Sequence, residues 1–531
     1  AATGSLGQGL SVAAGLGEAA LLDKIDRIIY CIIGDGEARE GQITEALDYI
    51  IDRKLTNVLP IFNCNGYGQA DRVSGQQSAE RLAAKLEAAG YTVKTIDGHS
   101  PKEIKAAFDA FMQNAEKTGA APMALVAKTV KGWGSQTVQG GGWHGKPATG
   151  DALRRALADL DERRVELTSS LVADDAFTIE PPEAAPTREP RQGELPLMSE
   201  AMRAMDMESL LHTGKLATRR AYGIALRALG NVNERVVVLD CDVSNSTFAE
   251  SFSKVNTLAD RFMECKIAEQ NMFSVAAGLS AAGKVPFCST FAKFVTRAYD
   301  QIEMAIYSGA NLKVVGSHCG LTLAADGPSQ MGLPDVSWFR SFSTMKDHRG
   351  NPGCYILQPA DAFAAYSLTN VMAEYEGCCY LRTGRPPVEF LYSDDVVFNL
   401  GGFEVLQEGR DVVICAAGFM VHEANKALEM FDKKGISVSL VDLYSLPFDT
   451  DALLDIVGAN SGNVITFEDN FGGGIGSAVA DALLESGDGF RLRQMHVKRI
   501  PKSAKSPEEV LKMCNLTAED LVKEAMDMLG V

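Results

Sequence analysis

The feature that most constrains this fold is a repeated alternation of short apolar runs with helical patterns. The first three runs are RIIYCII (27–33), NVLPIF (57–62) and MALVAK (123–128). Each run has the length of a buried strand, and apolar residues at helical spacing fill the segments between them. Because strands that alternate with helices usually pair in parallel, the sequence predicts an α/β fold built on parallel sheets.

The alternation occurs in three blocks, which indicates three domains. A chain of 531 residues is also too long for one hydrophobic core. A stretch rich in Pro and charge, from about residue 179 to residue 196, indicates a linker. The later runs are RVVVLD, NLKVVG and CYLRTGRP in the second block, then DVVICAAG, SVSLVDL, NVITFED and an amphipathic helix over 517–529 in the third. The predicted divisions are a first domain at 1–165, a linker at 166–214, and further domains at 215–395 and 396–531.

Composition narrows the classes of partner and location. A formal net charge of -18 repels phosphate backbones, which disfavours nucleic acid as a partner. No apolar run approaches the roughly 18 residues that cross a bilayer, so we expect no membrane span. The eleven cysteines show no framework spacing and the chain start has no signal-peptide pattern, so we expect a cytoplasmic location.

Two polar motifs follow successive predicted strands. GDGEAREG begins at Gly34 and NCNGYG begins at Asn63. Because ligands collect at the carboxyl ends of adjacent parallel strands, Asp35 and Asn65 are candidates to meet. A hard divalent cation bound to a diphosphate would accept their side-chain oxygens and the carbonyl oxygen of Tyr67. The alternative is a plain turn at GDG and a hairpin at NGYG, but the position of both motifs after strands favours the ligand site.

GDG followed about thirty residues later by Asn resembles the metal–diphosphate signature of thiamine-diphosphate enzymes. The neighbouring motifs resemble the transketolase family, in its animal-type form. These motifs are GSLGQGLS (4–11), WHGKP (143–147), KIAEQNMFSVAAGLS (266–280), GSHCG (316–320) and ADGPSQM (325–331). The resemblance implies three doubly wound α/β domains. The first two are thiamine-diphosphate-binding folds, for the diphosphate and for the pyrimidine, and the third is a C-terminal transketolase-type domain.

The resemblance also implies the cofactors and the residues that hold them. The cofactors are thiamine diphosphate and Mg²⁺ or Ca²⁺, the metal bound by Asp35, Asn65 and Tyr67. Glu269 would hydrogen-bond the aminopyrimidine to activate the cofactor, and His144 would join it in catalysis. An isolated glutamate of this kind is more often a helix cap or a salt-bridge partner, and aromatic residues at such spacing are more often core. The implied cofactor contacts are Gly4, Ser5, Leu6, Gly36, Glu37, Asn65, Lys131, His144, Glu269, Phe291 and Phe294.

An anionic substrate requires local cations in a chain this acidic, and the same resemblance assigns them. Phosphate binding falls to Arg219, Ser246, His318 and Arg385. Contacts to sugar hydroxyls fall to His144, Asp326 and Gln330. Any single arginine is most often a solvated surface residue, but here several segments match the family in one order.

The activity implied is reversible transfer of a two-carbon ketol unit between sugar phosphates. The donor would be a ketose such as xylulose 5-phosphate and the acceptor an aldose such as ribose 5-phosphate, through a C2 carbanion of the cofactor. A homodimer with active sites at the subunit interface is expected.

The likeness begins inside the family's first domain and lacks the family's N-terminal segment, which leaves alternatives open. The chain is a fragment, a natural short form, or one chain of a split enzyme whose partner supplies that segment. A second hypothesis is therefore a cofactor-binding subunit with weak catalysis. A third is a deoxyxylulose-phosphate-synthase-like enzyme, which would share Asp35, Asn65 and Glu269 but is not expected to carry WHGKP.

Overall fold

The computed structural model describes residues 4–169 and 189–531, which belong to two compact units. The N-terminal unit comprises residues 1–189 and the C-terminal unit residues 190–531. Most of the predicted linker stretch at 179–196 lies outside the described residues. Among the helices of these two ranges, none combines the length and the apolar character that a bilayer crossing requires.

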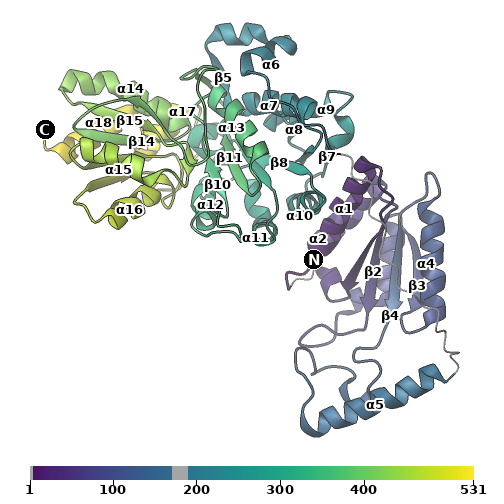
Figure 1. Cartoon of the computed structure of the whole chain (residues 1–531). Coiled ribbons are helices and arrows are strands. Elements are labelled where there is room, and N and C mark those ends of the chain that lie inside the picture. Colours follow the sequence, from purple (N-terminus) through teal and green to yellow (C-terminus); the bar gives the residue numbers. More distant parts are fainter. Residues whose placement is uncertain (1–3, 170–188) are drawn as a thin grey trace. The chain divides into compact units, whose positions relative to one another are not determined.

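The N-terminal unit is built on a parallel four-stranded sheet in the order β1-β2-β4-β3 (Figure 1). β4 coincides with the predicted run MALVAK, and β1 and β2 overlap the other two runs. β3 was not predicted because its sequence, TVKTID, has too few apolar residues to stand out. The bounds are β1 Ile29–Gly34, β2 Val58–Cys64, β3 Thr92–Asp97, β4 Met123–Lys128, α1 Gly9–Asp23, α2 Gly41–Arg53, α3 Ala79–Ala88, α4 Pro101–Ala115 and α5 Gly150–Thr168.

The first half of the C-terminal unit surrounds a seven-stranded sheet in the order β16-β10-β11-β9-β8-β6-β7. All neighbours are parallel except β16 (Ser445–Leu446), which comes from later in the chain and pairs antiparallel with β10. The bounds are β5 Lys215–Ala217, β6 Val236–Asp240, β7 Phe262–Glu264, β8 Val285–Phe291, β9 Lys313–Ser317, β10 Tyr355–Leu357, β11 Cys379–Thr383, β12 Pro387–Glu389, α6 Met198–Ala204, α7 Thr218–Val232, α8 Ser244–Thr247, α9 Glu250–Ser253, α10 Glu269–Ala281, α11 Tyr299–Tyr307, α12 Asp335–Ser343 and α13 Ala362–Glu374.

Part of the predicted linker 166–214 is folded onto this half. α6 buries Met198, Ala201 and Met202 against residues of α7 and α13. Its seven residues are too few for helical periodicity to mark it in the sequence, so its place depends on the surface on which it packs.

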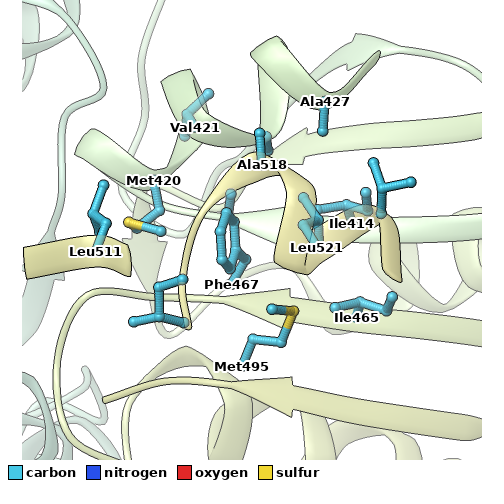
Figure 2. Packing of buried hydrophobic residues seen from close by; sticks show 14 of the residues in the cluster. Ile414, Met420, Val421, Ala427, Ile465, Phe467, Met495, Leu511, Ala518 and Leu521 are labelled. Carbon is cyan, nitrogen blue, oxygen red and sulfur yellow. The ribbon is translucent and has the colours of Figure 1, made fainter. Parts of the chain in front are cut away.

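The second half of the C-terminal unit has a five-stranded sheet in the order β13-β15-β14-β17-β18, in which only β13 is antiparallel. Figure 2 shows its core, where Leu521 of α18 and Met420 of α14 point toward Ile414 and Phe467 of the sheet. The bounds are β13 Glu404–Gln407, β14 Val412–Ala416, β15 Val438–Asp442, β17 Asn463–Phe467, β18 Arg491–Met495, α14 Phe419–Lys434, α15 Thr450–Ala459, α16 Ile475–Ser486, α17 Pro507–Cys514 and α18 Ala518–Leu529. The predicted α/β class is confirmed, with sheets that are parallel apart from the antiparallel edge strands β16 and β13.

Candidate active site

Asp35 and the loop that carries Asn65 meet at the carboxyl edge of the first sheet. β1 and β2 pair in parallel with Gly34 opposite Asn63, so the residues that follow both strands emerge side by side. Asp35 is 2% exposed. Its Oδ2 accepts a hydrogen bond from the Gly66 N–H at 2.6 Å, and the Asn65 Oδ1 accepts one from the Tyr67 N–H at 2.9 Å. The two motifs that the sequence places 30 residues apart therefore form one loop cluster.

Glu37 and Gln77 hold this cluster in shape. The Glu37 carboxylate accepts from the N–H groups of Gly7, at 3.0 Å, and Gly34, at 3.1 Å. It thus ties the GSLGQG segment, which contains the predicted contacts Gly4, Ser5 and Leu6, to the GDG loop. Gln77, which the sequence analysis missed, donates to the carbonyl oxygen of Asp35 at 2.8 Å. The capping-box spacing of Ser74 and Gln77 marks this residue in the sequence but not its partner.

Lys131 and His144 lie at the same cluster. The Lys131 Nζ donates to the Gly68 carbonyl oxygen at 2.7 Å and lies 3.3 Å from the His144 Nδ1. His144 is exposed, so its imidazole is accessible to a ligand. The glycine-rich segment that contains both residues therefore closes over the NGYG turn, as a loop that covers an anion would.

In the C-terminal unit, Glu269 and the two candidate aromatic residues occupy the carboxyl edge of the seven-stranded sheet. Glu269 is the first residue of α10 and is 6% exposed. Within the described ranges, no hydrogen bond or ion pair engages its carboxylate. Phe291 ends β8, and its ring stacks on Phe294, with centroids 5.2 Å apart and an interplanar angle of 8°. This arrangement places a stacked aromatic pair and a carboxylate from a separate element at the same sheet edge.

His318 connects the aromatic pair to an arginine. Its ring stacks on Phe291 at 3.9 Å, its Nδ1 lies 2.9 Å from the Ser317 Oγ, and its Nε2 lies 3.3 Å from the Arg219 guanidinium. Burial lowers the pKa of His318 to about 3, with Arg219 and Arg385 adding to the effect. The imidazole is therefore neutral at physiological pH and accepts a hydrogen bond from Arg219.

The cationic residues of the predicted phosphate site lie together. Burial lowers the pKa of Arg219, and the neighbouring charge of Arg385 lowers it further. One Arg219 nitrogen donates to the Ser246 carbonyl oxygen at 2.6 Å, so Ser246 contributes its backbone here. Arg385 lies 3.5 Å from the Asp326 carboxylate. Gln330 follows four residues after Asp326 on the same loop and is half-buried.

Both groups of residues fit phosphate-bearing ligands. The Nε of Arg219 is buried and has no partner among the described residues, which suits a site that receives an anion. A Cβ added at Gly4 or Gly66 would meet no atom within 4 Å, so there is open space beside both loops. The described residues contain no cluster of three or more His, Cys, Asp or Glu side chains that could hold a metal. A cation at Asp35 and Asn65 would thus need further oxygens, which a bound diphosphate supplies.

Comparison with domain families gives three matches along the chain. Residues 1–162 match the transketolase thiamine diphosphate binding domain, residues 214–389 the transketolase pyrimidine binding domain, and residues 401–521 the transketolase C-terminal domain.

Individual proteins agree with these matches. The chain is 36% identical to a rat transketolase over 530 residues, which cover 98% of this chain and 79% of the relative. It is 35% identical to the human transketolase over 536 residues, or 99% and 80% of the two chains. A structure described as a split gene transketolase in an inactive β4 tetramer is 36% identical, with a TM-score of 0.52 over 59% of this chain and 98% of that chain. The Campylobacter jejuni transketolase, at 18% identity, has a TM-score of 0.74 over 99% and 82% of the chains and shares the fold.

Proposed function

Because this chain belongs to the transketolase family, we propose that it transfers a two-carbon ketol unit from a ketose phosphate to an aldose phosphate. The observation that carries the proposal is the continuous set of contacts from Phe294 through Phe291 and His318 to Arg219. It joins a stacked aromatic pair to a neutral acceptor and a half-buried arginine whose buried Nε has no partner among the described residues. Such a series suits a heteroaromatic cofactor at one end and a phosphorylated sugar at the other.

Thiamine diphosphate is the cofactor that the first-domain match supports. When bound, it supplies the nucleophilic carbon and the electron sink that cleavage beside a ketone requires. We assign the metal, Mg²⁺ or Ca²⁺, to the oxygens of Asp35, Asn65 and the Tyr67 carbonyl. Lys131 and His144 would contact the diphosphate from the covering loop, and Gly4, Ser5, Leu6 and Gly36 would line it. Glu37 would act mainly by keeping the Gly7 and Gly34 backbones in place.

Glu269 and the aromatic pair would act on the pyrimidine ring. Phe291 and Phe294 would stack on it, and the Glu269 carboxylate would hold a proton at a ring nitrogen and so direct proton movement at the amino group. Its burial without a hydrogen-bonding partner among the described residues supports this role, since a carboxylate in that position gains most from a ligand N–H.

The sugar phosphate would bind beside this surface. Arg219, Arg385 and the Ser246 segment would bind the phosphate, and the neutral His318 imidazole would accept from a hydroxyl or from Arg219. Asp326, Gln330 and His144 would contact sugar hydroxyls. His318 is buried and neutral, so it would orient the substrate without adding charge.

We also assign a homodimer and a cytoplasmic location to this chain. The membership of the chain in the transketolase family supports the homodimer. All eleven cysteines are free in the described residues, which supports a reducing compartment.

A second candidate is a subunit that binds the cofactor but needs another chain for full catalysis. The likeness to an inactive split-gene assembly favours it. So does the edge strand β1, where Ile32 is 72% exposed and Tyr30 is 50% exposed. Exposed apolar side chains on an unpaired edge are typical of a surface that another segment covers.

The deciding experiment measures ketol transfer from xylulose 5-phosphate to ribose 5-phosphate by the full chain with thiamine diphosphate and Mg²⁺. Wild type and Glu269→Ala are compared, and cofactor binding is measured for both by calorimetry. We expect turnover in the wild type and a loss of at least about 100-fold in the variant, typical of losing a proton-transfer group, with cofactor binding largely kept.

Two other outcomes separate the alternatives. Cofactor binding without turnover by the wild type supports the second candidate and contradicts the first. Carbon–carbon bond formation from pyruvate, with none from xylulose 5-phosphate, supports a deoxyxylulose-phosphate-synthase-like enzyme instead. Near-normal turnover by Glu269→Ala contradicts the role assigned to Glu269.

A further inference from the structure

We propose that Asp469, in the third domain, is a positioning residue for the loop that recognises the sugar. The loop comprises residues 318–334 and is called the recognition loop, since it contains His318, Asp326 and Gln330. Asp469 follows β17 in the turn FEDNF (467–471), here called the anchor turn. The inference rests on the proposed function, because it concerns how that same site is held.

Asp469 contacts the start of the recognition loop directly. Its Oδ2 accepts a hydrogen bond from the Leu321 N–H at 3.2 Å, across 148 residues of sequence. The carboxylate is 5% exposed. It lies so close to Gly320, which has φ +64°, that a Cβ at that position would overlap it. Only a glycine in the left-handed region allows the loop to approach this carboxylate.

Arg382 extends the contact to the other end of the loop. One of its nitrogens lies 3.5 Å from the Asp469 Oδ1, and another donates to the Gly332 carbonyl oxygen at 3.2 Å. Its Nε donates to the Asp335 Oδ2 at 2.8 Å, just past the loop. Arg382 is itself 5% exposed. A single buried guanidinium therefore joins the anchor turn to both the exit of the loop and the helix that follows it.

Backbone hydrogen bonds also connect the third domain to the recognition loop. The Phe471 N–H donates to the Leu333 carbonyl oxygen at 2.9 Å, and the Ala504 N–H donates to that of Ala324 at 3.1 Å. The apolar side of the loop is part of the third domain's core, the cluster shown in part in Figure 2. The loop residues buried in that core are Leu321, Leu323, Ala324, Met331 and Leu333.

Two residues of the loop have backbone conformations that need such support. His318 has φ +57° and Ala324 has φ +32°, and neither is glycine. Residues of this kind keep a left-handed conformation only where the surroundings hold them. His318 also stacks on Phe291, so a change in its backbone would move a group that contacts both the aromatic pair and Arg219. Asp469 thus acts through the loop and not on the substrate.

The test compares the full wild-type chain with Asp469→Asn and with a matched control, Asp481→Asn. Asp481 also forms an ion pair between the second and third domains, with Arg340, but it lies on the surface and outside the anchor turn. Hydrogen–deuterium exchange of peptides covering 318–334 is measured first, because it requires no activity. KM for xylulose 5-phosphate, kcat and the dissociation constant of thiamine diphosphate follow.

We expect Asp469→Asn to increase exchange in 318–334 and to raise KM by about 10-fold or more, because the amide can still accept from the Leu321 N–H but loses the charge that pairs with Arg382. The change in kcat and in cofactor affinity should be under about 2-fold, and Asp481→Asn should change neither exchange nor KM. Unchanged exchange in the loop contradicts the proposal. The proposal is also contradicted if Asp481→Asn raises KM to the same extent. It is contradicted as well if Asp469→Asn weakens the binding of thiamine diphosphate as much as it raises KM.

A second variant keeps the test decisive if Asp469→Asn does not fold. Gly320→Ala retains every charge but forces the loop start away from Asp469, so it should reproduce the exchange and KM changes. Normal hydrogen–deuterium exchange and a normal KM in Gly320→Ala would contradict the proposed role of Asp469. A wild type with no turnover contradicts the proposed function alone, since the exchange comparison still tests whether Asp469 holds the loop.

Discussion

A single guanidinium illustrates how the site handles charge at the residue scale. Arg219 is partly buried, faces a second arginine and contacts an imidazole that burial keeps neutral. Its nearest acceptor is the carbonyl oxygen of Ser246, which carries no net charge. Although the chain has a net charge of -18, these contacts give the Arg219 guanidinium no negatively charged partner. A bound anion would therefore stabilise it.

Arg219→Gln should therefore raise KM for a ketose phosphate by about 10-fold to 100-fold, the usual effect of losing a charged hydrogen bond. The same variant should barely change KM for a ketose that lacks phosphate, because the lost partner is the phosphate itself. Steady-state kinetics with the two substrates give this comparison. Equal changes for both ketoses would contradict a phosphate role.

Asp35 is the proposed carboxylate ligand of the metal. Asp35→Asn keeps the size of the side chain and one acceptor oxygen, but it removes the charge and one of the two hydrogen bonds from the Gly36 and Gly66 N–H groups. We expect the dissociation constant of thiamine diphosphate in Mg²⁺ to rise by about 10-fold or more, as charge is lost from a hard-cation site. Calorimetry with and without Mg²⁺ measures this change, and an unaltered metal dependence would remove Asp35 from the metal site.

At the element scale, the last helix shows how the third domain is stabilised. α18 begins at a capping box formed by Thr517 and Asp520. Leu521, Val522 and Ala525 are then buried in the core of the domain, and Leu521 lies beside Ile414 of the sheet (Figure 2). The helix therefore combines a local start signal with an apolar face at helical spacing, which explains why the sequence predicted it over 517–529.

Leu521→Ala should lower the free energy of unfolding of this domain by about 2 to 5 kcal/mol, because Leu521 is fully buried and its loss leaves a cavity. Lys523→Ala, at an exposed position of the same helix, is the control and should change the stability by less than about 0.5 kcal/mol. Urea unfolding followed by circular dichroism measures both. A loss below 1 kcal/mol in the leucine variant would contradict the packing described.

At the scale of the whole molecule, buried carboxyl groups lie where segments from different parts of the chain meet. Asp442 ends β15 in the third domain, and its Oδ2 accepts from the Tyr392 hydroxyl at 2.7 Å, across 50 residues. Burial raises the pKa of Asp442 to about 8. Between the ordinary aspartate pKa and pH 8, the folded chain thus holds a proton that the unfolded chain releases.

Stability should consequently fall as pH rises through that window, because the folded state binds more protons than the unfolded state. Asp442→Asn cannot titrate, so its stability relative to the wild type should increase with pH, by at most about 1.4 kcal/mol per pH unit. Urea midpoints at pH 5, 7 and 8.5 check the sign. Asp395→Asn, at an exposed position nearby, should show a constant difference, and a constant difference for Asp442→Asn would contradict the assignment.

Candidate site residues could be predicted from the sequence where a polar side chain directly follows a predicted strand. Asp35 and Asn65 follow predicted strands, and parallel pairing brings such positions to one edge. Phe291 and His318 lie at or just after the ends of β8 and β9, but only the family resemblance pointed to them. Gln77 and Asp469 were missed because their roles depend on contacts across 42 and 148 residues of sequence. Neither lies in a motif whose spacing reveals its partner. The contact of the third domain with the recognition loop is visible only in the folded chain.

The sequence by itself determined the α/β class, half of the described strands and the motifs at their ends, because strand and helix periods and turn residues are local properties. Tertiary structure decided the rest. It placed α6 within a predicted linker, paired β16 with a distant strand, and set the neutral state of His318. These depend on which surfaces meet and how much water they exclude, and burial of that kind is a property of the whole fold.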